Sequence, residues 1–118
     1  MALPQTGIFA LGTVAHSYLE FELRGSPPDA DVARAVADLT EPRTTMGGVN
    51  LVTGFRPELW SSAAPSRSPR DLHGFVDPVV GTGGFTMPAT QRDLFVWIAG
   101  GSYDVVFDAA IGMIAGPG

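Results

Sequence analysis

The sequence predicts an α+β protein with a ferredoxin-like split βαβ arrangement, in which helices cover one face of an antiparallel sheet. The chain has 118 residues, of which 45% are hydrophobic, so it is long enough and apolar enough for one domain with a core. Apolar residues alternate in some segments and recur at helical spacing in others. The predicted order is strand, helix, strand, strand, helix. A fourth strand would complete the unit, and we expect that final strand to be missing.

The first half of the chain contains one predicted strand and one predicted helix. Residues 16–23 form a strand because apolar side chains alternate with two glutamates (Leu19, Phe21 and Leu23; Glu20 and Glu22). Residues 29–39 form a helix with an apolar stripe, and its first turn carries acidic residues that the helix dipole favours. Residues 1–15 are predicted to be an arm that lies over the core.

The second half contains two predicted strands, one helical turn and a final helix (49–53, 94–98, 57–60 and 103–114). The continuous apolar run at 94–98 is typical of a strand that is covered on both faces. Ser102 is in position to cap the final helix. Residues 61–92 are rich in proline, serine and glycine and form a long loop, and loops of this length are usually functional, interfacial or mobile.

The charge balance excludes several classes of protein. The formal net charge is −5, and a nucleic-acid-binding protein needs a basic face, so we expect no nucleic-acid partner. The absence of cysteine excludes disulfides and thiolate metal sites. No segment approaches the ~20 apolar residues of a membrane span, and residues 8–15 are a poor secretory signal. We therefore expect a cytoplasmic protein that does not interact with membranes.

The two histidines are the first candidates for a site. His16 opens the first strand and His73 lies in the long loop, and neither has a second ligand at metal-binding spacing. Asp71 and Asp77 flank His73, and residues 61–68 include serines, so the sequence contains the residue types of a Ser/His/Asp catalytic set. The sequence contains no nucleophile elbow, however. Ordinary surface histidines are therefore the preferred interpretation.

The remaining polar candidates are also better explained as surface or loop residues than as catalytic or ligand-binding groups. Two exposed glutamates on one strand face, Glu20 and Glu22, indicate a solvated edge rather than an acid–base pair. Residues 81–84 lack the lysine of a P-loop and indicate a flexible loop. Arg43 and Arg56 are possible anion ligands. The large aromatic side chains are expected in the core or at an interface (Phe55, Trp60, Phe75, Phe85, Phe95 and Trp97).

Five segments, in the same order, resemble bacterial dye-decolorizing haem peroxidases. They are a "PQxGI"-type opening, two early strands, a "PAT..DL" segment and a "DVVFD"-type helix (residues 4–9, 18–21, 48–55 with 59–60, 87–94 and 105–108). Together they extend over nearly the whole chain. The resemblance implies that residues 1–118 are the amino-terminal, ferredoxin-like half of such an enzyme.

The same resemblance implies what this half does not contain. Enzymes of the family consist of two ferredoxin-like halves and bind haem b. They reduce hydrogen peroxide and oxidise dyes or other organic donors. Their catalytic aspartate lies in a GxxDG motif beyond the first half, and their distal arginine and proximal histidine lie in the second half. Residues 74–77 resemble the start of that motif, with Asp77 in the position of the aspartate, but Pro78 replaces the closing glycine and the segment lies before the "PAT..DL" segment. No catalytic, cofactor-binding or metal-binding residue is therefore assigned, and the chain alone is expected to be inactive and to bind no haem.

Two expectations concern partners. Without a fourth strand, the edge of residues 16–23 and the apolar segment 109–115 lose their cover, so we expect self-association into a homo-oligomer, or pairing with the carboxy-terminal half of the peroxidase. The alternative function is a stand-alone dimeric α+β barrel that acts as a binding or assembly module or as a small monooxygenase.

Overall fold

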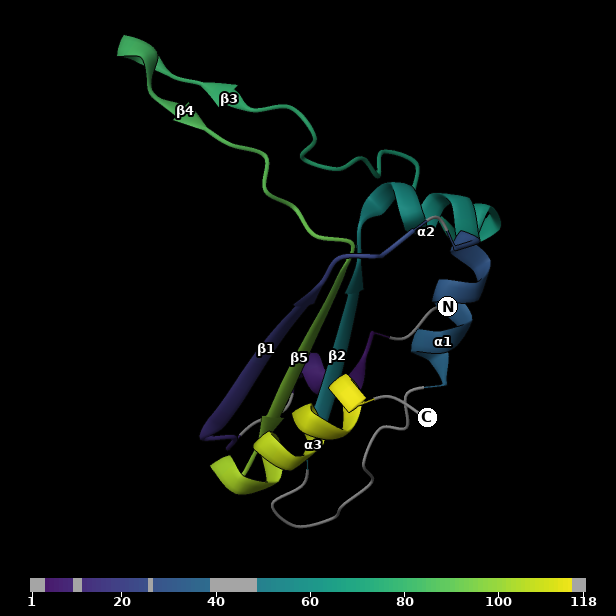
Figure 1. Ribbon diagram of the computed structural model, residues 1–118, viewed down its shortest axis with the longest axis vertical. Coiled ribbons are helices and arrows are strands. Elements are labelled where there is room, and N and C mark those ends of the chain that lie inside the picture. The colour runs from purple at the N-terminus through teal and green to yellow at the C-terminus, as the bar shows by residue number, and fades with distance from the viewer. Residues whose placement is uncertain (1–3, 10–11, 26, 39–48, 116–118) are drawn as a thin grey trace.

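The computed structural model describes residues 4–9, 12–25, 27–38 and 49–115. Its main sheet has three antiparallel strands in the order β1 (Ala15–Phe21), β5 (Leu94–Gly100) and β2 (Asn50–Phe55) (Figure 1). The last strand in the sequence therefore lies between the first two. This order, with helices in the connections, is that of a ferredoxin-like unit, so the predicted α+β fold class is confirmed.

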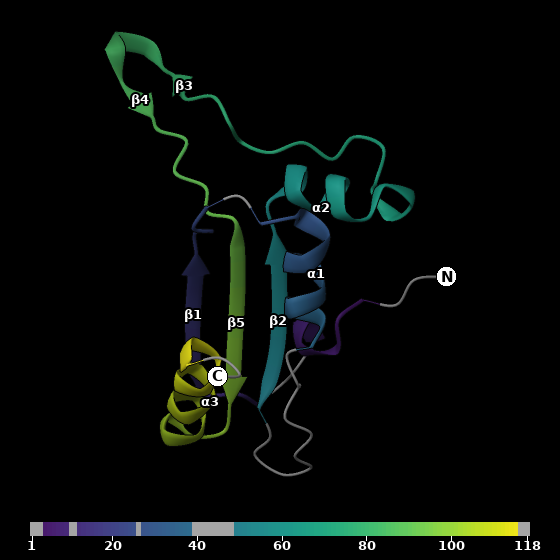
Figure 2. The same ribbon diagram turned by 45° about the vertical axis from the view of Figure 1, so that its right-hand side comes forward.

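Within the described residues, three α-helices accompany the sheet: α1 (Asp29–Ala37), α2 (Pro57–Ala63) and α3 (Tyr103–Ala115). Figure 2 shows α3 in front of the β1 side of the sheet, whereas α1 lies beside β2 and packs against α2. Pro57 occupies the first helical position of α2, where its missing N–H costs no hydrogen bond. None of the described helices is long and apolar enough to cross a membrane.

The core lies between one face of the sheet and α3. Its buried members come from all three strands and from one side of the helix (Ala15, Val49, Leu51, Val96, Ile98, Val106 and Ala110). Ile98 and Val106 have 0% and 1% of their surface exposed. The central strand and α3 therefore bury the largest side chains of this cluster, while Leu59 of α2 is fully buried at a separate point.

In the described part of the chain, the opposite face of the sheet carries no α-helix, and only the short 3₁₀ turn Thr6–Phe9 packs there, beside Val52 of β2. The register places Tyr18 beside Trp97 and Glu20 beside Phe95 on this open face. Tyr18 is 62% exposed and Phe95 is 37% exposed. The prediction that the 94–98 strand is covered on both faces is therefore wrong, because its apolar run includes aromatic residues that lie at a solvent-exposed face.

An arm closes the outer edge of β2. The 3₁₀ turn Thr6–Phe9 lies against this strand. The side-chain amide of Gln5 donates to the carbonyl oxygen of Thr53 (2.7 Å) and accepts the Thr53 backbone N–H (2.8 Å). A Cβ atom on Gly7 would lie 2.9 Å from the Leu51 carbonyl oxygen, so this close approach requires glycine. The segment predicted as an arm over the core at residues 1–15 thus lies along the edge of β2 instead, and its last residue, Ala15, belongs to β1.

The long loop predicted at 61–92 contains structure of its own. Its first residues complete α2, a 3₁₀ turn follows at Pro65–Arg67, and β3 (Val79–Val80) pairs with β4 (Thr86–Met87). The hairpin projects away from the main sheet (Figure 1). At its tip, the 3₁₀ turn Thr82–Gly84 includes two glycines with φ of +76° and +84°, a conformation that other residues adopt at a cost. The glycine-rich segment is therefore a hairpin tip.

Several element boundaries differ from the predictions. The strand predicted at 16–23 ends at Phe21, and the one predicted at 49–53 continues to Phe55. The helical turn predicted at 57–60 extends to Ala63, and the helix predicted at 29–39 reaches Ala37, with residue 39 outside the described residues. Local periodicity does not report where pairing with another strand begins and ends.

The final helix is predicted correctly to within one residue of its end. Its spacing predicts an apolar stripe of Val106, Ala110, Met113 and Ile114. The first three lie in or against the core, whereas Ile114 is 60% exposed. The exposed side of α3 carries four large apolar residues at helical spacing (Tyr103, Phe107, Ile111 and Ile114). The helix is therefore apolar on two sides, a pattern that is typical of a helix with a second layer packed on it.

Candidate functional site

Asp93 links the three strands at the end of the sheet from which the hairpin leaves. Its Oδ1 accepts a hydrogen bond from the Nε of Arg56 (2.9 Å), and its Oδ2 accepts the backbone N–H of Leu23 (2.8 Å). Its backbone N–H donates to the carbonyl oxygen of Phe21 (3.0 Å), and its carbonyl oxygen accepts the N–H of Arg56 (2.8 Å). One residue therefore ties the ends of β1 and β2 to the start of β5. We call these contacts the Asp93 clasp.

The carboxylate of Glu58 holds the loop that follows α2. Its Oε1 accepts the backbone N–H of Gly74 at 2.9 Å. Hydrogen bonds from its own backbone N–H and from that of Gly74 lower the pKa of Glu58, and the charges of Arg56 and nearby His73 lower it further. A Cβ atom on Gly74 would lie 2.6 Å from the carboxylate, so glycine permits the contact.

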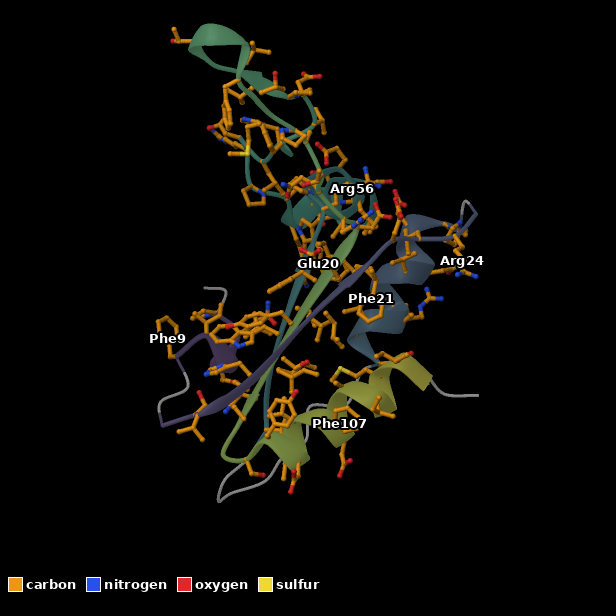
Figure 3. The ribbon with its side chains drawn as sticks, turned by 60° about the vertical axis from the view of Figure 1, so that its left-hand side comes forward. Phe9, Glu20, Phe21, Arg24, Arg56 and Phe107 are labelled. Carbon is orange, nitrogen blue, oxygen red and sulfur yellow. The ribbon has the colours of Figure 1, made fainter. Side chains whose placement is uncertain are left out.

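A recess of about 230 Å³ lies between the Asp93 clasp and this loop. Its lining mixes acidic, basic and aromatic side chains, among them Glu20, Arg56, Glu58, Arg92 and Phe95. Figure 3 shows Arg56 and Glu20 at this end of the molecule. Arg56 is already paired with Asp93, and Arg92 is paired with Glu22 at 3.3 Å. The positive charges are therefore neutralised within the protein, which makes this recess a poor anion site.

Four rings form an aromatic cluster on the open face of the sheet: His16, Tyr18, Phe95 and Trp97. Neighbouring ring centroids lie 5.9–6.4 Å apart, with interplanar angles of 12–27°. The indole Nε1–H of Trp97 donates to Nδ1 of His16 at 3.1 Å. A neutral imidazole that accepts at Nδ1 carries its proton on Nε2, so this bond selects the tautomer of His16.

The structure does not assemble the Ser/His/Asp set that the sequence allows on paper. Ser61 and Ser68 bond to each other through their hydroxyl oxygens at 2.8 Å. His73 lies near Glu58, and Asp77 is exposed at the base of the hairpin. The described residues contain no group of three or more potential metal-ligating side chains. Arg43, the second possible anion ligand, lies outside the described residues.

The described residues do not fit an axially ligated haem. Haem proteins hold the iron through a side chain such as histidine beside an enclosed pocket. His16 stacks on Tyr18 and Trp97 at an exposed sheet face, and His73 lies on an exposed loop. Neither the 230 Å³ recess nor the larger open hollow near Trp60 and Leu72 is lined by a histidine.

Sequence reasoning did not assign roles to Gln5, which closes the edge of β2, or to Asp93, which joins the strand ends. Both belong to segments that carry the peroxidase resemblance, the "PQxGI" opening and the "PAT..DL" segment. The sequence therefore contained these two residues within recognisable motifs, although it did not indicate their structural roles. The partners of Asp93 lie 37 and 70 residues away, which no local pattern reports.

The remaining aromatic predictions hold in part. Phe55 and Trp60 pack against each other at 5.2 Å and are half-buried, as expected for core or interface residues. Phe85 is 68% exposed on the hairpin and contributes to no core in the described residues. Glu20 and Glu22 are both exposed, as the interpretation of a solvated edge predicts.

No protein-family model matches the sequence, and no curated protein matches it at a significant level. Among solved structures, the chain is similar to a dye-decolorizing peroxidase from Bacteroides thetaiotaomicron, with a TM-score of 0.61 and 19% sequence identity. The similarity covers 92% of this chain and 37% of the peroxidase chain. The chain thus spans little more than a third of that enzyme's length. At this identity the likeness establishes the fold: the chain has the ferredoxin-like fold of one domain of a dye-decolorizing peroxidase.

Proposed function

We propose that this chain is the amino-terminal, ferredoxin-like domain of a haem-dependent peroxidase of the dye-decolorizing type. Such an enzyme reduces hydrogen peroxide and oxidises dyes or other organic donors. The observation that carries the proposal is the fold likeness to a peroxidase over 92% of this chain but only 37% of that enzyme. Five sequence segments that resemble the family, in the same order, support it.

The role that we propose for the domain is structural. A haem peroxidase needs an axial ligand and a distal group that moves a proton across the peroxide. The described residues offer no pocket with such a set. They offer the exposed aromatic cluster and the uncovered apolar side of α3, which are suited to contact with another domain. Haem would therefore be held by residues outside this domain.

The complete coding region provides the direct test. We expect it to continue beyond residue 118 into a second domain, and the complete protein to show a Soret band with haem and peroxide-dependent dye oxidation. The 118-residue chain should oxidise dye no faster than free haemin. Peroxide turnover by this chain alone, with haem held by its own side chains, would overturn the proposal. A His16→Ala and His73→Ala pair would identify the ligand in that case.

A second candidate is a stand-alone dimeric α+β barrel that acts as a binding or assembly module or as a small monooxygenase. The observation that favours it is the open sheet face, on which Tyr18 is 62% exposed, because such dimers bury sheet faces against each other. A coding region that stops directly after residue 118 would select this candidate over the peroxidase domain.

A further inference from the structure

The recess beside the Asp93 clasp is built by segments that lie far apart in the sequence. Its lining comes from the end of β1, from the junction of β2 and α2, and from the segments that lead into and out of the β3–β4 hairpin (residues 74–76 and 91–95). The Glu58 carboxylate holds the backbone N–H of Gly74 at 2.9 Å, and the clasp holds the strand ends. These contacts lie within one domain, so they fix the walls of the recess before a ligand arrives. A preformed site avoids the cost of ordering on binding.

The charge of this recess favours a cation. Each of the two guanidinium groups in its lining has a carboxylate partner within 3.3 Å. The lining contains two further carboxylates, those of Glu20 and Glu58, and neither is in an ion pair among the described residues. Hydrogen bonds from the backbone N–H groups of Glu58 and Gly74 lower the pKa of Glu58, so this side chain is negatively charged at neutral pH. The lining therefore offers carboxylate oxygens to a ligand, whereas its basic groups are already engaged.

Aromatic side chains supply the apolar part of the lining. Phe75 and Phe95 both contribute, and Phe95 is 37% exposed. Gly54 of β2 pairs with Phe95, and a Cβ atom on Gly54 would meet only the Phe95 side chain within 4 Å among the described residues. Because Gly54 has no side chain, the surface next to the Phe95 ring stays open. An aromatic ring attracts a cation through its π face and offers apolar contact to the rest of the ligand.

We propose that this recess binds a small organic cation, with its charged group beside the carboxylates of Glu58 and Glu20 and its apolar body against Phe95. An ammonium or amidinium group supplies both the positive charge and the N–H donors that carboxylate oxygens accept. The volume of about 230 Å³ lies below the ~300–1,000 Å³ of sites for drug-sized molecules, so the ligand is smaller than these. The inference does not depend on the assignment to a peroxidase, because it uses contacts within this domain alone.

Other classes of ligand fit the recess less well. An anion would meet two carboxylates and would have to displace Asp93 from Arg56. A neutral aromatic molecule would contact Phe95, but it would take water away from the nearby carboxylates without replacing the lost hydrogen bonds. A metal ion lacks a set of ligands, since the described residues contain no group of three or more potential metal-ligating side chains. Charge and shape therefore favour the same class of ligand.

Ligand titrations followed by NMR test this class directly. The probe is benzylamine, an alkylamine that is a cation at pH 7, and benzyl alcohol and benzoate are its neutral and anionic counterparts of similar shape. Benzylamine should bind the 118-residue chain with a Kd of about 1 mM or lower, and the two counterparts should bind at least about tenfold more weakly. The amide shifts should be largest at Gly54, Gly74 and Phe95. Equal binding of all three probes, shifts centred elsewhere in the chain, or no binding of benzylamine would overturn the proposal.

A matched pair of variants tests the role of the carboxylate. Glu58→Gln removes the charge and keeps a side-chain oxygen that accepts the Gly74 N–H, so the loop stays in place. It should raise the Kd of benzylamine about three- to fivefold, the effect of one exposed ion pair. Asp108→Asn makes the same change in net charge at an exposed position of α3 outside the recess, and screening should keep its effect below about twofold. Equal effects of the two variants would reject the site.

A second variant tests the shape of the recess without changing a charge. Gly54→Val fills the open surface beside Phe95, where the added Cβ atom would lie at an ordinary 3.6 Å from that side chain. Valine is favoured in strands, so the Tm should not fall. The Kd of benzylamine should rise about tenfold or more, because the apolar contact is lost. Gly54→Ala, which adds only the Cβ atom, should have a smaller effect in the same direction.

Unchanged binding of benzylamine by both Gly54 variants would show that the ligand lies elsewhere, and the proposal would be rejected. The Glu58→Gln comparison decides the question independently if the Tm of Gly54→Val falls. None of these measurements involves haem or peroxide, so a failure here leaves the proposed function unaffected.

Discussion

The two outer strands of the sheet face solvent in different ways. At β2, the side chain of Gln5 makes two hydrogen bonds to the backbone of Thr53, and the Thr6–Phe9 turn lies along the strand. At β1, no described residue replaces a neighbouring strand in this way. Within the described residues, the N-terminal arm thus covers the edge of β2, and no segment does the same for β1.

The contrast shows how a short segment can end a sheet without adding a strand. A primary amide carries one acceptor and two donors, so it reproduces the hydrogen bonds of a single backbone unit. Gln5 uses this property at one point of β2, and Gly7 allows the arm to approach closely enough. Along β1, none of the described residues makes such a contact, and α3 packs on β1 and β5.

Loss of the Asp93 clasp should have the largest effect, because it holds both outer strands to β5. Asp93→Ala leaves the Arg56 guanidinium, which is 35% exposed, and the Leu23 N–H without their acceptor. We expect a loss of about 3 kcal/mol in the free energy of unfolding, measured by urea denaturation. Asp93→Asn keeps an acceptor for one of these donors and should cost about half as much. Equal stability of all three proteins would show that the clasp is not needed.

An added methyl group on the arm should affect the β2 edge alone. Gly7→Ala brings a Cβ atom within 2.9 Å of both the Leu51 carbonyl oxygen and the Val52 side chain. We expect a loss of about 2 kcal/mol from this overpacking, or release of the arm with faster hydrogen exchange at Thr53. The matched control is Gly112→Ala in α3, where a Cβ atom would meet nothing within 4 Å. This substitution should stabilise the helix slightly, because alanine has a higher helix propensity than glycine. The prediction fails if both variants behave alike.

The smallest expected effect is the pH dependence that Glu58 contributes beside the clasp. Hydrogen bonds from backbone N–H groups lower the pKa of Glu58 below its ordinary value of 4.5. A carboxylate with a lowered pKa stabilises the fold above the unfolded value, and this contribution disappears as the pH falls through the folded value. Glu58→Gln should therefore lower the Tm slightly at pH 7, and the difference should shrink as the pH falls below 4.5. A difference in Tm that is constant with pH would contradict this.

The prediction from sequence succeeded where a pattern is local. The alternation of Leu19 and Phe21 with Glu20 identified β1, and helical spacing identified α3 to within a residue of its end. It failed at the strand 94–98, because a continuous apolar run predicts burial of both faces. In the structure, Phe95 and Trp97 of that run belong to the exposed aromatic cluster. A run of apolar side chains predicts that the side chains are buried. It does not show whether they are buried within the same domain or against a different one.

The candidate site was harder to predict than the fold. His16 and His73 were singled out because histidine is the commonest catalytic and metal-binding side chain. The structure places one in an aromatic cluster and the other near Glu58. The hairpin β3–β4 was expected to be loop, since strands of two residues are too short for a periodic pattern to be recognised.

By itself, the amino-acid sequence determined the order of the three main-sheet strands and of the helices between them, the absence of cysteine chemistry and the acidic charge. These properties depend on composition or on neighbours a few residues apart, which a linear pattern contains in full. Only the tertiary structure decided that Asp93 joins three strands, that Gln5 closes the edge of β2 and that His16 stacks with Tyr18 and Trp97. Most of these contacts join residues tens of positions apart, and their geometry exists only after the chain has folded.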